Sequence, residues 1–246
     1  MGQVEIQFLG SGVVLGDGGR FQICFHVNTG ECRFLIDCGT SSLIAMRRFG
    51  VDPGQIDIIL LSHLHGDHFG GIPFLILDAQ FSRRTRPLII AGPPGLKRRI
   101  VDAMEVFFPG SSQVPQKFII EYIEYQDRRP VPLGAVKAIP FTVIHPSGAP
   151  SYALRVETQG KVITYSGDTE WTQALVEAAR GADIFICEAY MFEKKVKYHL
   201  DYRTLMAHRK ELDSPRLFLT HMREEMLAKL KDIDAEWTED GQRVIL

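Results

Sequence analysis

The chain has 246 residues, of which 45% are hydrophobic and 24% are charged, and this balance is typical of a folded globular protein. Its formal net charge of −2 gives no general attraction to nucleic acid, so a polyanion would need a local basic patch. The sequence has no apolar run of membrane-spanning length and no signal peptide pattern. We therefore expect a cytoplasmic protein without a membrane partner, and its four cysteines, which form no C-x-x-C pair, to be reduced and buried.

The pattern of apolar residues and turn signals predicts strands that first form hairpins and later alternate with helices. Strands are expected over residues 4–9, 21–27, 33–36, 56–61, 88–91, 118–125, 136–144, 151–157, 161–165, 183–187 and 217–220. Helices are expected over 41–49, 69–84, 96–108, from a cap at 166–169 to about 180, 202–211 and 224–230. This order favours an α/β fold of two packed mixed sheets with helices outside, in one domain over residues 1–246.

One stretch, His63-Leu64-His65-Gly66-Asp67-His68, places four metal-binding side chains within six residues. Histidines two apart project to the same side of an extended segment, so His63 and His65 can hold one ion together. Gly66 lets the backbone turn, so Asp67 and His68 can face a neighbouring position. The arrangement suits two metals with a bridging water or hydroxide, and it favours metal binding over a solvated loop.

Three further candidates follow predicted strands directly: His145, Asp168 and His221. Functional loops gather at strand ends, but an isolated histidine or aspartate there is more often a turn or cap residue. The three are therefore informative only together with the histidine-rich stretch. His26 and His208 have no such context, and we expect them to be structural.

The H-x-H-x-D-H string after a buried strand, with these three residues in order, resembles the metallo-β-lactamase superfamily. The resemblance implies a four-layer αββα sandwich with metals at one edge of the sheets. The implied ligands are His63, His65 and His145 for one ion, Asp67, His68 and His221 for the second, and Asp168 as a bridge between both. Imidazole and carboxylate ligands without thiolate suit two zinc ions, with manganese or iron as alternatives.

Two carboxylates refine the resemblance. True metallo-β-lactamases lack an aspartate at the position that matches Asp168 and are exported, so antibiotic hydrolysis is not expected. Asp37, in Leu35-Ile36-Asp37-Cys38-Gly39, matches the early D-x-G motif of the family. Its implied role is to orient a ligand histidine, and a cap for the helix near Ser41 is an equal alternative.

The expected chemistry is phosphodiester hydrolysis. Two divalent ions bring four positive charges, and Asp67, Asp168 and a bridging hydroxide remove three, so the site attracts an anion. The hydroxide, oriented by Asp67, is the candidate nucleophile. His199 is the candidate general acid, because Glu188-Ala189 followed by a histidine resembles ribonuclease Z-like members. Leu200 departs from that motif, which has a hydroxyl residue there, and a surface histidine is the alternative.

Gly92-Pro93-Pro94-Gly95 also resembles ribonuclease Z and its small-phosphodiesterase relatives. Ribonuclease Z carries a tRNA-gripping arm between the residues that match His145 and Asp168, where this chain has only 22 residues. We therefore expect a small or cyclic phosphodiester substrate, with RNA in ribonuclease Z-like tRNA 3′ processing as the alternative. Basic clusters at 83–86, 97–99 and 128–129 can contact phosphates, but such runs are usually solvated faces.

Other classes stay open. A thioester hydrolase of the glyoxalase II type uses a similar ligand set, but it has a helical C-terminal segment where one helix is predicted here. A metal-binding scaffold that has lost catalysis is the non-enzyme alternative.

Family members often form homodimers, and apolar residues such as 104–108 suit either an interface or a core. The glycine-rich and polar loops at 11–20 and 109–117 are expected to border the pocket.

Overall fold

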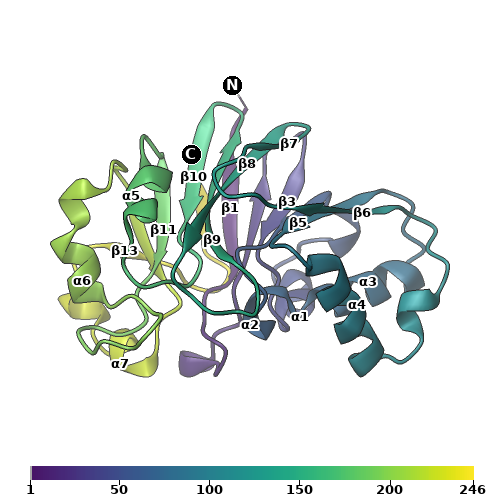
Figure 1. Ribbon diagram of the computed structural model, residues 1–246, viewed down its shortest axis with the longest axis horizontal. Helices are drawn as coiled ribbons and strands as arrows, with labels where there is room; N and C mark the ends of the chain where they lie inside the picture. Colours follow the sequence, from purple (N-terminus) through teal and green to yellow (C-terminus); the bar gives the residue numbers. More distant parts are fainter. Residues whose placement is uncertain (1) are drawn as a thin grey trace.

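The computed structural model describes residues 2–246, in which two seven-stranded mixed sheets pack face to face between two layers of helices (Figure 1). In spatial order, the strands of the first sheet are β14 (Arg243–Ile245), β1 (Glu5–Gly10), β2 (Cys24–Asn28), β3 (Arg33–Ile36), β4 (Ile58–Leu60), β5 (Leu88–Gly92) and β6 (Ile120–Glu124). Those of the second are β13 (Glu236–Trp237), β12 (Leu217–Thr220), β11 (Ile184–Glu188), β10 (Lys161–Tyr165), β9 (Ser151–Thr158), β8 (Val136–Val143) and β7 (Val131–Leu133). The α-helices are α1 (Ser42–Arg48), α2 (Gly66–Phe69), α3 (Ile72–Phe81), α4 (Leu96–Phe107), α5 (Gln173–Ala179), α6 (Tyr202–Ala207) and α7 (Glu224–Leu227).

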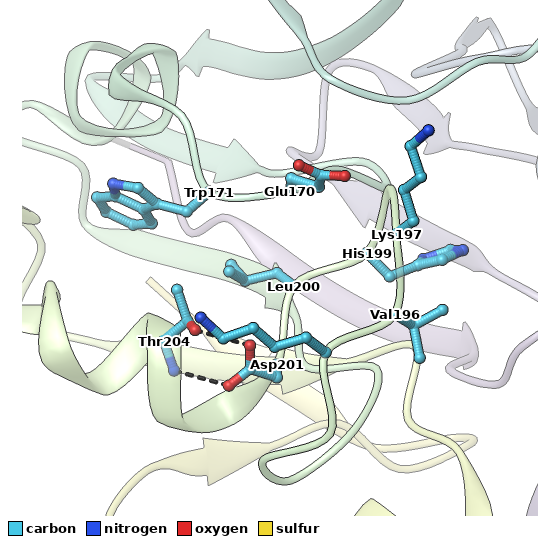
Figure 2. Close-up of a pocket in the computed structure, with 9 residues that line it drawn as sticks. Glu170, Trp171, Val196, Lys197, His199, Leu200, Asp201 and Thr204 are labelled. Atoms are coloured by element: carbon cyan, nitrogen blue, oxygen red, sulfur yellow. Dashed lines mark hydrogen bonds between the residues drawn. The ribbon is translucent and has the colours of Figure 1, made fainter.

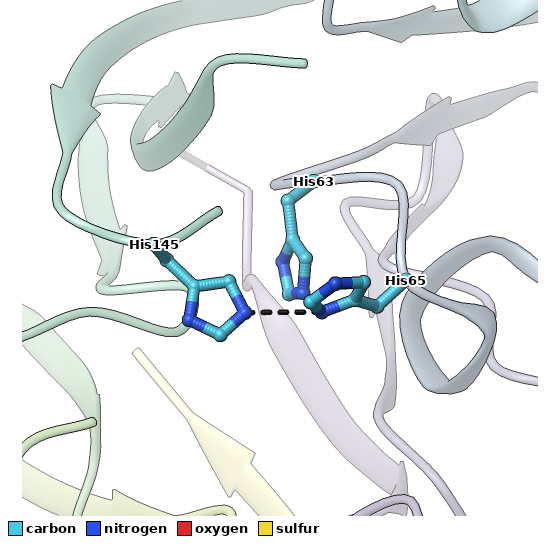
Figure 3. Close-up of side chains that lie close together, drawn as sticks. All are labelled: His63, His65 and His145. Carbon is cyan, nitrogen blue, oxygen red and sulfur yellow. Dashed lines mark hydrogen bonds between the residues drawn. The ribbon is translucent and has the colours of Figure 1, made fainter. Parts of the chain in front are cut away.

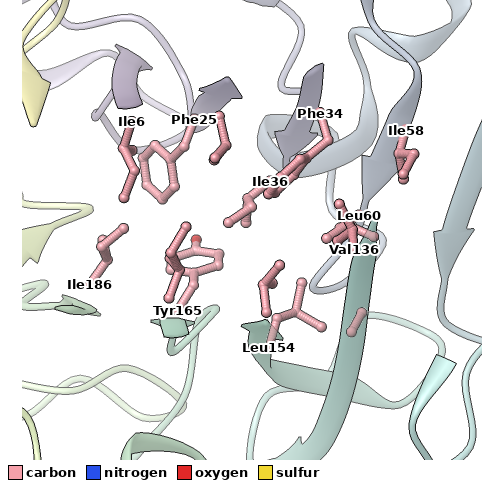
Figure 4. Close-up of a cluster of buried hydrophobic side chains, with 14 of the residues drawn as sticks. Ile6, Phe25, Phe34, Ile36, Ile58, Leu60, Val136, Leu154, Tyr165 and Ile186 are labelled. Carbon is pink, nitrogen blue, oxygen red and sulfur yellow. The ribbon is translucent and has the colours of Figure 1, made fainter. Parts of the chain in front are cut away.

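The central core lies between the two sheets, whose inward-facing side chains meet in Figure 4. Alternation along a strand sends every second residue into this layer, as Phe25 and Val27 of β2 show. The Phe25 ring meets Tyr165 of the other sheet edge to face, with centroids 5.2 Å apart. Such aromatic pairs add to the burial of apolar surface that holds the sheets together.

Two further apolar clusters attach the helices to the outer faces. Leu35 of the first sheet packs in a cluster with Ile76 of α3, and Phe185 of the second packs with Leu175 of α5 and Leu205 of α6. The layers therefore run helix, sheet, sheet, helix. The predicted four-layer αββα sandwich is confirmed.

Each sheet has a parallel half, and this positions the site. β3, β4, β5 and β6 run parallel in the first sheet, and β10, β11, β12 and β13 run parallel in the second. The carboxyl ends of parallel strands meet at one edge of a sheet, so the loops that follow them lie together. The histidine-rich stretch follows β4, and the loops after β10 and β12 carry Asp168 and His221.

Two helices differ from the sequence prediction in their course or start, and α6 and α7 end earlier than predicted, at Ala207 and Leu227. The helix predicted over 69–84 is interrupted between α2 and α3 by Gly70 and Gly71. A Cβ on Gly71 would lie 2.2 Å from the Gly39 carbonyl oxygen, so the backbones can approach only at a glycine. The helix expected from a cap at 166–169 instead begins at α5, where the Thr172 side chain accepts the Ala174 N–H. The 166–169 prediction was wrong because this segment belongs to the site.

Three short edge strands, β7, β13 and β14, were not predicted, because two or three residues carry almost no periodic signal.

Among residues 2–246, none of the helices combines the length and apolar character that a membrane span requires.

Arg84 does not belong to a solvated basic face. Its guanidinium is buried and donates hydrogen bonds to backbone carbonyls of two adjoining loops. The accepting residues are Pro53, Gly54, Ile56, Arg86 and Pro87. Five donors in one planar group suit this task, so Arg84 holds loops together and is withdrawn from phosphate binding.

His26 lies in the interior, in agreement with the expected structural role. It sits in β2 between Gln7 and Leu35 on the neighbouring strands, and neither ring nitrogen has a hydrogen-bond partner among residues 2–246. Burial lowers the pKa of His26 from 6.5 to about 4, and the charges of Arg33 and Arg243 add to the effect. The folded protein therefore holds this ring neutral.

The buried neutral ring predicts an acid-dependent loss of stability. The unfolded chain takes up the His26 proton near pH 6.5 and the folded chain only near pH 4, so unfolding becomes easier as pH falls through that interval. The contribution reaches up to about 3 kcal/mol. Urea unfolding of wild type and His26→Gln between pH 7 and about pH 4 should show a shallower pH dependence in the variant. Parallel profiles would contradict this assignment.

Candidate functional site

The seven predicted metal ligands converge at the shared edge of the two sheets. Three of them, His63, His65 and His145, form one group, with ring centroids 4.9 to 5.0 Å apart (Figure 3). His145 Nε2 and His65 Nδ1 are 3.0 Å apart. Residues 80 positions apart in sequence thus present ring nitrogens to one point.

The second group consists of Asp67, His68 and His221. Asp67 Oδ2 lies 3.5 Å from His68 Nε2 and 3.3 Å from His221 Nε2. All three side chains are buried. The spacing is that of a ligand set, since about 3.3 Å separates two ligand atoms that each lie 2.0–2.1 Å from a tetrahedral ion.

Asp168 lies between the two groups, with one oxygen toward each. Its Oδ2 is 3.8 Å from His63 Nε2 and 3.8 Å from His145 Nε2. Its Oδ1 is 3.5 Å from His68 Nε2 and 3.5 Å from His221 Nδ1. This is the geometry expected of a carboxylate that contacts two ions.

Several polar atoms in the cluster have no hydrogen-bond partner within the described residues, although they are buried. They are His63 Nε2, His68 Nε2, Asp168 Oδ1 and His221 Nδ1. A buried polar atom without a partner is costly, and each of these four belongs to a predicted ligand. The donor set therefore fits divalent metal ions, which would take up the free atoms of His63, His68 and Asp168, while His221 would offer its other nitrogen, Nε2, beside Asp67.

Without metal, the acids and imidazoles of the cluster perturb one another. Burial raises the pKa of Asp67, but the charge of His68 and the hydrogen bond from His221 outweigh it and hold that pKa well below its usual range. Burial lowers the pKa of His68, but the carboxylates of Asp168 and Asp67 outweigh it and raise that pKa well above its usual range. A cationic centre suits this concentration of carboxylate charge.

Asp37 orients the second group and does not cap a helix. Its Oδ2 lies 2.7 Å from His68 Nδ1, and its two oxygens accept hydrogen bonds from the Ser62 N–H and hydroxyl, each 2.7 Å long. With Nδ1 donating to Asp37, His68 keeps Nε2 free toward the site. Asp37 adopts a positive φ of 57°, while Ser41 caps α1 without a side-chain hydrogen bond.

Two other rings are fixed in the same way. The His145 Nδ1–H donates to the Tyr198 carbonyl at 2.9 Å, and His63 Nδ1 lies 3.0 Å from the Ser62 hydroxyl. In both rings the opposite nitrogen, Nε2, is left toward Asp168. Fixed tautomers of this kind are usual for metal-binding histidines.

His199 lies beside the cluster and is not a remote surface histidine. Its Nδ1–H donates to Glu188 Oε2 at 2.9 Å and is 4.0 Å from Asp168 Oδ2. Burial lowers the pKa of His199, but the Glu188 carboxylate outweighs it and raises that pKa. Glu188 is itself fully buried and accepts the Thr169 backbone N–H.

A cavity of about 270 Å³ opens on the other side of His199 (Figure 2). Glu170, Trp171, Lys195 and Lys197 contribute to its wall together with His199. The lining therefore combines two lysines and an aromatic ring with the carboxylates of Glu170 and Asp201, and His199 is the residue that it shares with the cluster.

The structure places the two loops that were expected at the pocket in different surroundings. The loop at 11–20 borders the site, because the Ser11 carbonyl accepts the His221 N–H at 3.1 Å. The loop at 109–117 packs against the end of α3, where the Gln80 side chain donates to the Ser111 carbonyl.

Sequence reasoning missed one residue at the site, Tyr190. Its ring stacks on His199, with centroids 4.0 Å apart and an angle of 13°. A signal was present, since Tyr190 comes two residues after Glu188, but an aromatic residue after a strand is usually core.

Residues 4–242 match the family model described as anti-Pycsar protein Apyc1. The chain belongs to this family. ML1173, an uncharacterized protein of Mycobacterium leprae, is 38% identical over 159 residues, which are 63% of this chain and 54% of the relative. The chain thus spans about half the length of that relative. Ribonuclease Z of Agathobacter rectalis is 25% identical over 264 residues, covering 89% of this chain and 87% of the relative.

Solved structures share the fold over the full chain. The metallo-β-lactamase fold protein YhfI of Bacillus subtilis superposes with a TM-score of 0.78 at 19% identity, covering 100% of both chains. The short form of human tRNase Z also gives 0.78, at 22% identity and 98% coverage of both chains. The chain therefore has the metallo-β-lactamase fold, and its histidine–aspartate cluster is compatible with the binding of divalent metal ions.

The Asp37 contacts predict a loss of metal affinity without a loss of fold. Asp37→Asn replaces one of the two acceptor oxygens with an NH2 donor and cannot accept all three hydrogen bonds from Ser62 and His68, so the tautomer of His68 is less firmly fixed, and zinc affinity should fall about 10- to 100-fold. Competition with a fluorescent zinc chelator measures the affinity. The matched control is Asp52→Asn, at an exposed aspartate that caps a short 3-10 helix elsewhere on the first sheet. Equal affinities in the folded variant and wild type would contradict this role.

Proposed function

We propose that the chain is a dinuclear metal-dependent phosphodiesterase that hydrolyses a small cyclic phosphodiester, with a cyclic nucleotide as the favoured substrate class. One observation carries the proposal. A hydrogen-bonded pair, His199 and Glu188, lies beside the carboxylate of Asp168, which in turn lies between two groups of metal-type side chains. The arrangement joins an anion-binding centre to a proton donor.

The two groups that contain His63 and His68, with Asp168 between them, would hold the ions. Zinc fits the imidazole and carboxylate donors best, with manganese and iron as alternatives. Only two carboxylates belong to the set, so two divalent ions would leave the centre positive and supply attraction for a phosphate anion and a nucleophile at neutral pH.

The residues of the chain supply orientation and proton transfer. Asp67, at the inner side of the cluster, would accept a hydrogen bond from the attacking water and orient it toward phosphorus. His199 would give a proton to the departing oxygen. Because its Nδ1–H is held by Glu188, the transferable proton resides on Nε2.

The proton donor favours a phosphodiester over a thioester. A thiol has a pKa near 8.5, so a thiolate leaves readily without protonation, whereas an alkoxide is far more basic. A buried carboxylate that raises the pKa of a histidine, as Glu188 does for His199, is therefore useful chiefly for an oxygen leaving group. The leaving group therefore distinguishes the proposed reaction from that of the glyoxalase II type.

The path of the chain between His145 and Asp168 favours a small substrate over tRNA. Residues 146–167 form a turn and the β9–β10 hairpin, whose strands lie inside the second sheet. An extended arm is therefore absent from this part of the described chain. Ribonuclease Z-like processing is retained as the second candidate, because the ribonuclease Z relatives align along 89% of the chain.

Turnover of three substrates by metal-loaded protein tests the proposal. We expect zinc- or manganese-dependent hydrolysis of 3′,5′-cyclic nucleotides and of bis(p-nitrophenyl) phosphate, little cleavage of a tRNA precursor, and no turnover after chelation. Asp168→Ala should lose bound metal and turnover together, while Asp52→Ala keeps both. Efficient cleavage of the tRNA precursor alone would favour the second candidate. Full metal loading with no cleavage of any diester would overturn the proposal.

A further inference from the structure

Tyr190 is placed so that its ring covers one face of His199. It lies two residues after the end of β11 at Glu188, and its backbone N–H donates to the Leu200 carbonyl at 2.8 Å, which ties the two ends of the 190–200 segment together. The Tyr190 and His199 rings are nearly parallel, at 13°. Tyr190 also stacks more loosely on His221, with centroids 5.8 Å apart.

A network on the other side of Tyr190 holds that ring in place. Arg223 Nη1 donates to the Tyr190 hydroxyl at 3.2 Å, and the Arg223 backbone N–H donates to the Tyr190 carbonyl at 3.0 Å. The Arg223 Nε donates in turn to Asp17, which also accepts the Glu224 N–H at 2.9 Å. Asp17 belongs to the 11–20 loop, so a loop at the edge of the site is connected to the ring that covers His199.

We propose that Tyr190 is a positioning residue that fixes the ring plane of His199. This inference rests on the proposed function, in which His199 protonates the leaving oxygen. Neither Tyr190 nor its partners needs to touch the reacting atoms.

A hydrogen bond alone does not fix the His199 ring. The bond from Nδ1 to Glu188 fixes one atom, but the ring can still tilt about that contact. A parallel aromatic face at 4.0 Å blocks the tilt from one side. Proton transfer is sensitive to such placement, because a displacement of about 1 Å in a reacting group can cost about 100-fold in rate.

The dependence of the rate on the leaving group separates positioning from general structural damage. The alkoxide that leaves a cyclic nucleotide needs a proton, whereas p-nitrophenolate is weakly basic and leaves without one. A residue that acts through His199 should matter for the first substrate and hardly for the second. A residue that supports the metals or the fold should matter for both.

The experiment compares Tyr190→Leu, Tyr190→Phe and a matched control, Phe192→Leu, on the two substrates. Phe192 lies two residues further along the same segment and stacks on Tyr202. We expect Tyr190→Leu to lower kcat about tenfold for a 3′,5′-cyclic nucleotide and less than about threefold for bis(p-nitrophenyl) phosphate, with unchanged metal content. Tyr190→Phe keeps the stacked ring and should restore most of the rate, and Phe192→Leu should show no difference between the substrates.

His199→Ala, measured alongside, separates the two claims. It should show the same selectivity for the cyclic substrate with a larger loss, about 100-fold or more, and it should retain its metal. Equal losses on both substrates for His199→Ala would overturn the acid role and the Tyr190 inference with it. Selective loss in His199→Ala but an equal loss, or none, in Tyr190→Leu would overturn the Tyr190 inference alone.

A second measurement needs no turnover. In the NMR spectrum of the zinc-loaded protein, the stacked Tyr190 ring shields the carbon-bound ring protons of His199, so Tyr190→Leu should move these resonances downfield and Tyr190→Phe should not. His208, which stacks on Trp171, supplies the internal reference. Unmoved His199 resonances in Tyr190→Leu would overturn the inference, whatever the kinetics.

Discussion

The rest of the molecule depends on one electrostatic constraint: imidazoles and carboxylates are gathered in a buried pocket where they cannot fully satisfy one another. His63, His68, His221 and Asp168 each keep a buried polar atom without a partner. Buried polar atoms of this kind are costly, so a bound cation would stabilise the pocket by completing their contacts. Asp37 and the Tyr198 carbonyl serve the same end, because each fixes a ring so that its free nitrogen faces inward.

The burial of aromatic and branched side chains between the two sheets offsets the free-energy cost of this buried polar cluster. Since each sheet has a parallel half, strand ends that are distant in sequence meet at one edge, and the ligand groups come from both sheets. The close backbone approach of Gly71 to Cys38 and Gly39 holds the histidine-rich turn against the segment that carries Asp37. The packing of the two sheets therefore also determines where the ligand groups lie.

The features that could be predicted from the sequence are those with a local or periodic signal. The spacing of His63, His65, Asp67 and His68 pointed to metal before any fold was known, and strands such as β10 and β12 were delimited correctly by their apolar runs. Short edge strands failed because two or three residues have no period. The predictions for the start of α5 and for Arg84 were wrong because both features depend on partners far away in sequence. Tyr190 was missed for that reason too, since its stacking on His199 exists only in the folded chain.

The central claim is that the cluster holds two ions with Asp168 between them. Anomalous diffraction at the zinc edge from crystals of the zinc-loaded protein tests it most directly. The account predicts two peaks, one within reach of His63, His65 and His145 and the other within reach of Asp67, His68 and His221, with Asp168 contacting both. A single peak, or none, in fully loaded crystals would contradict it.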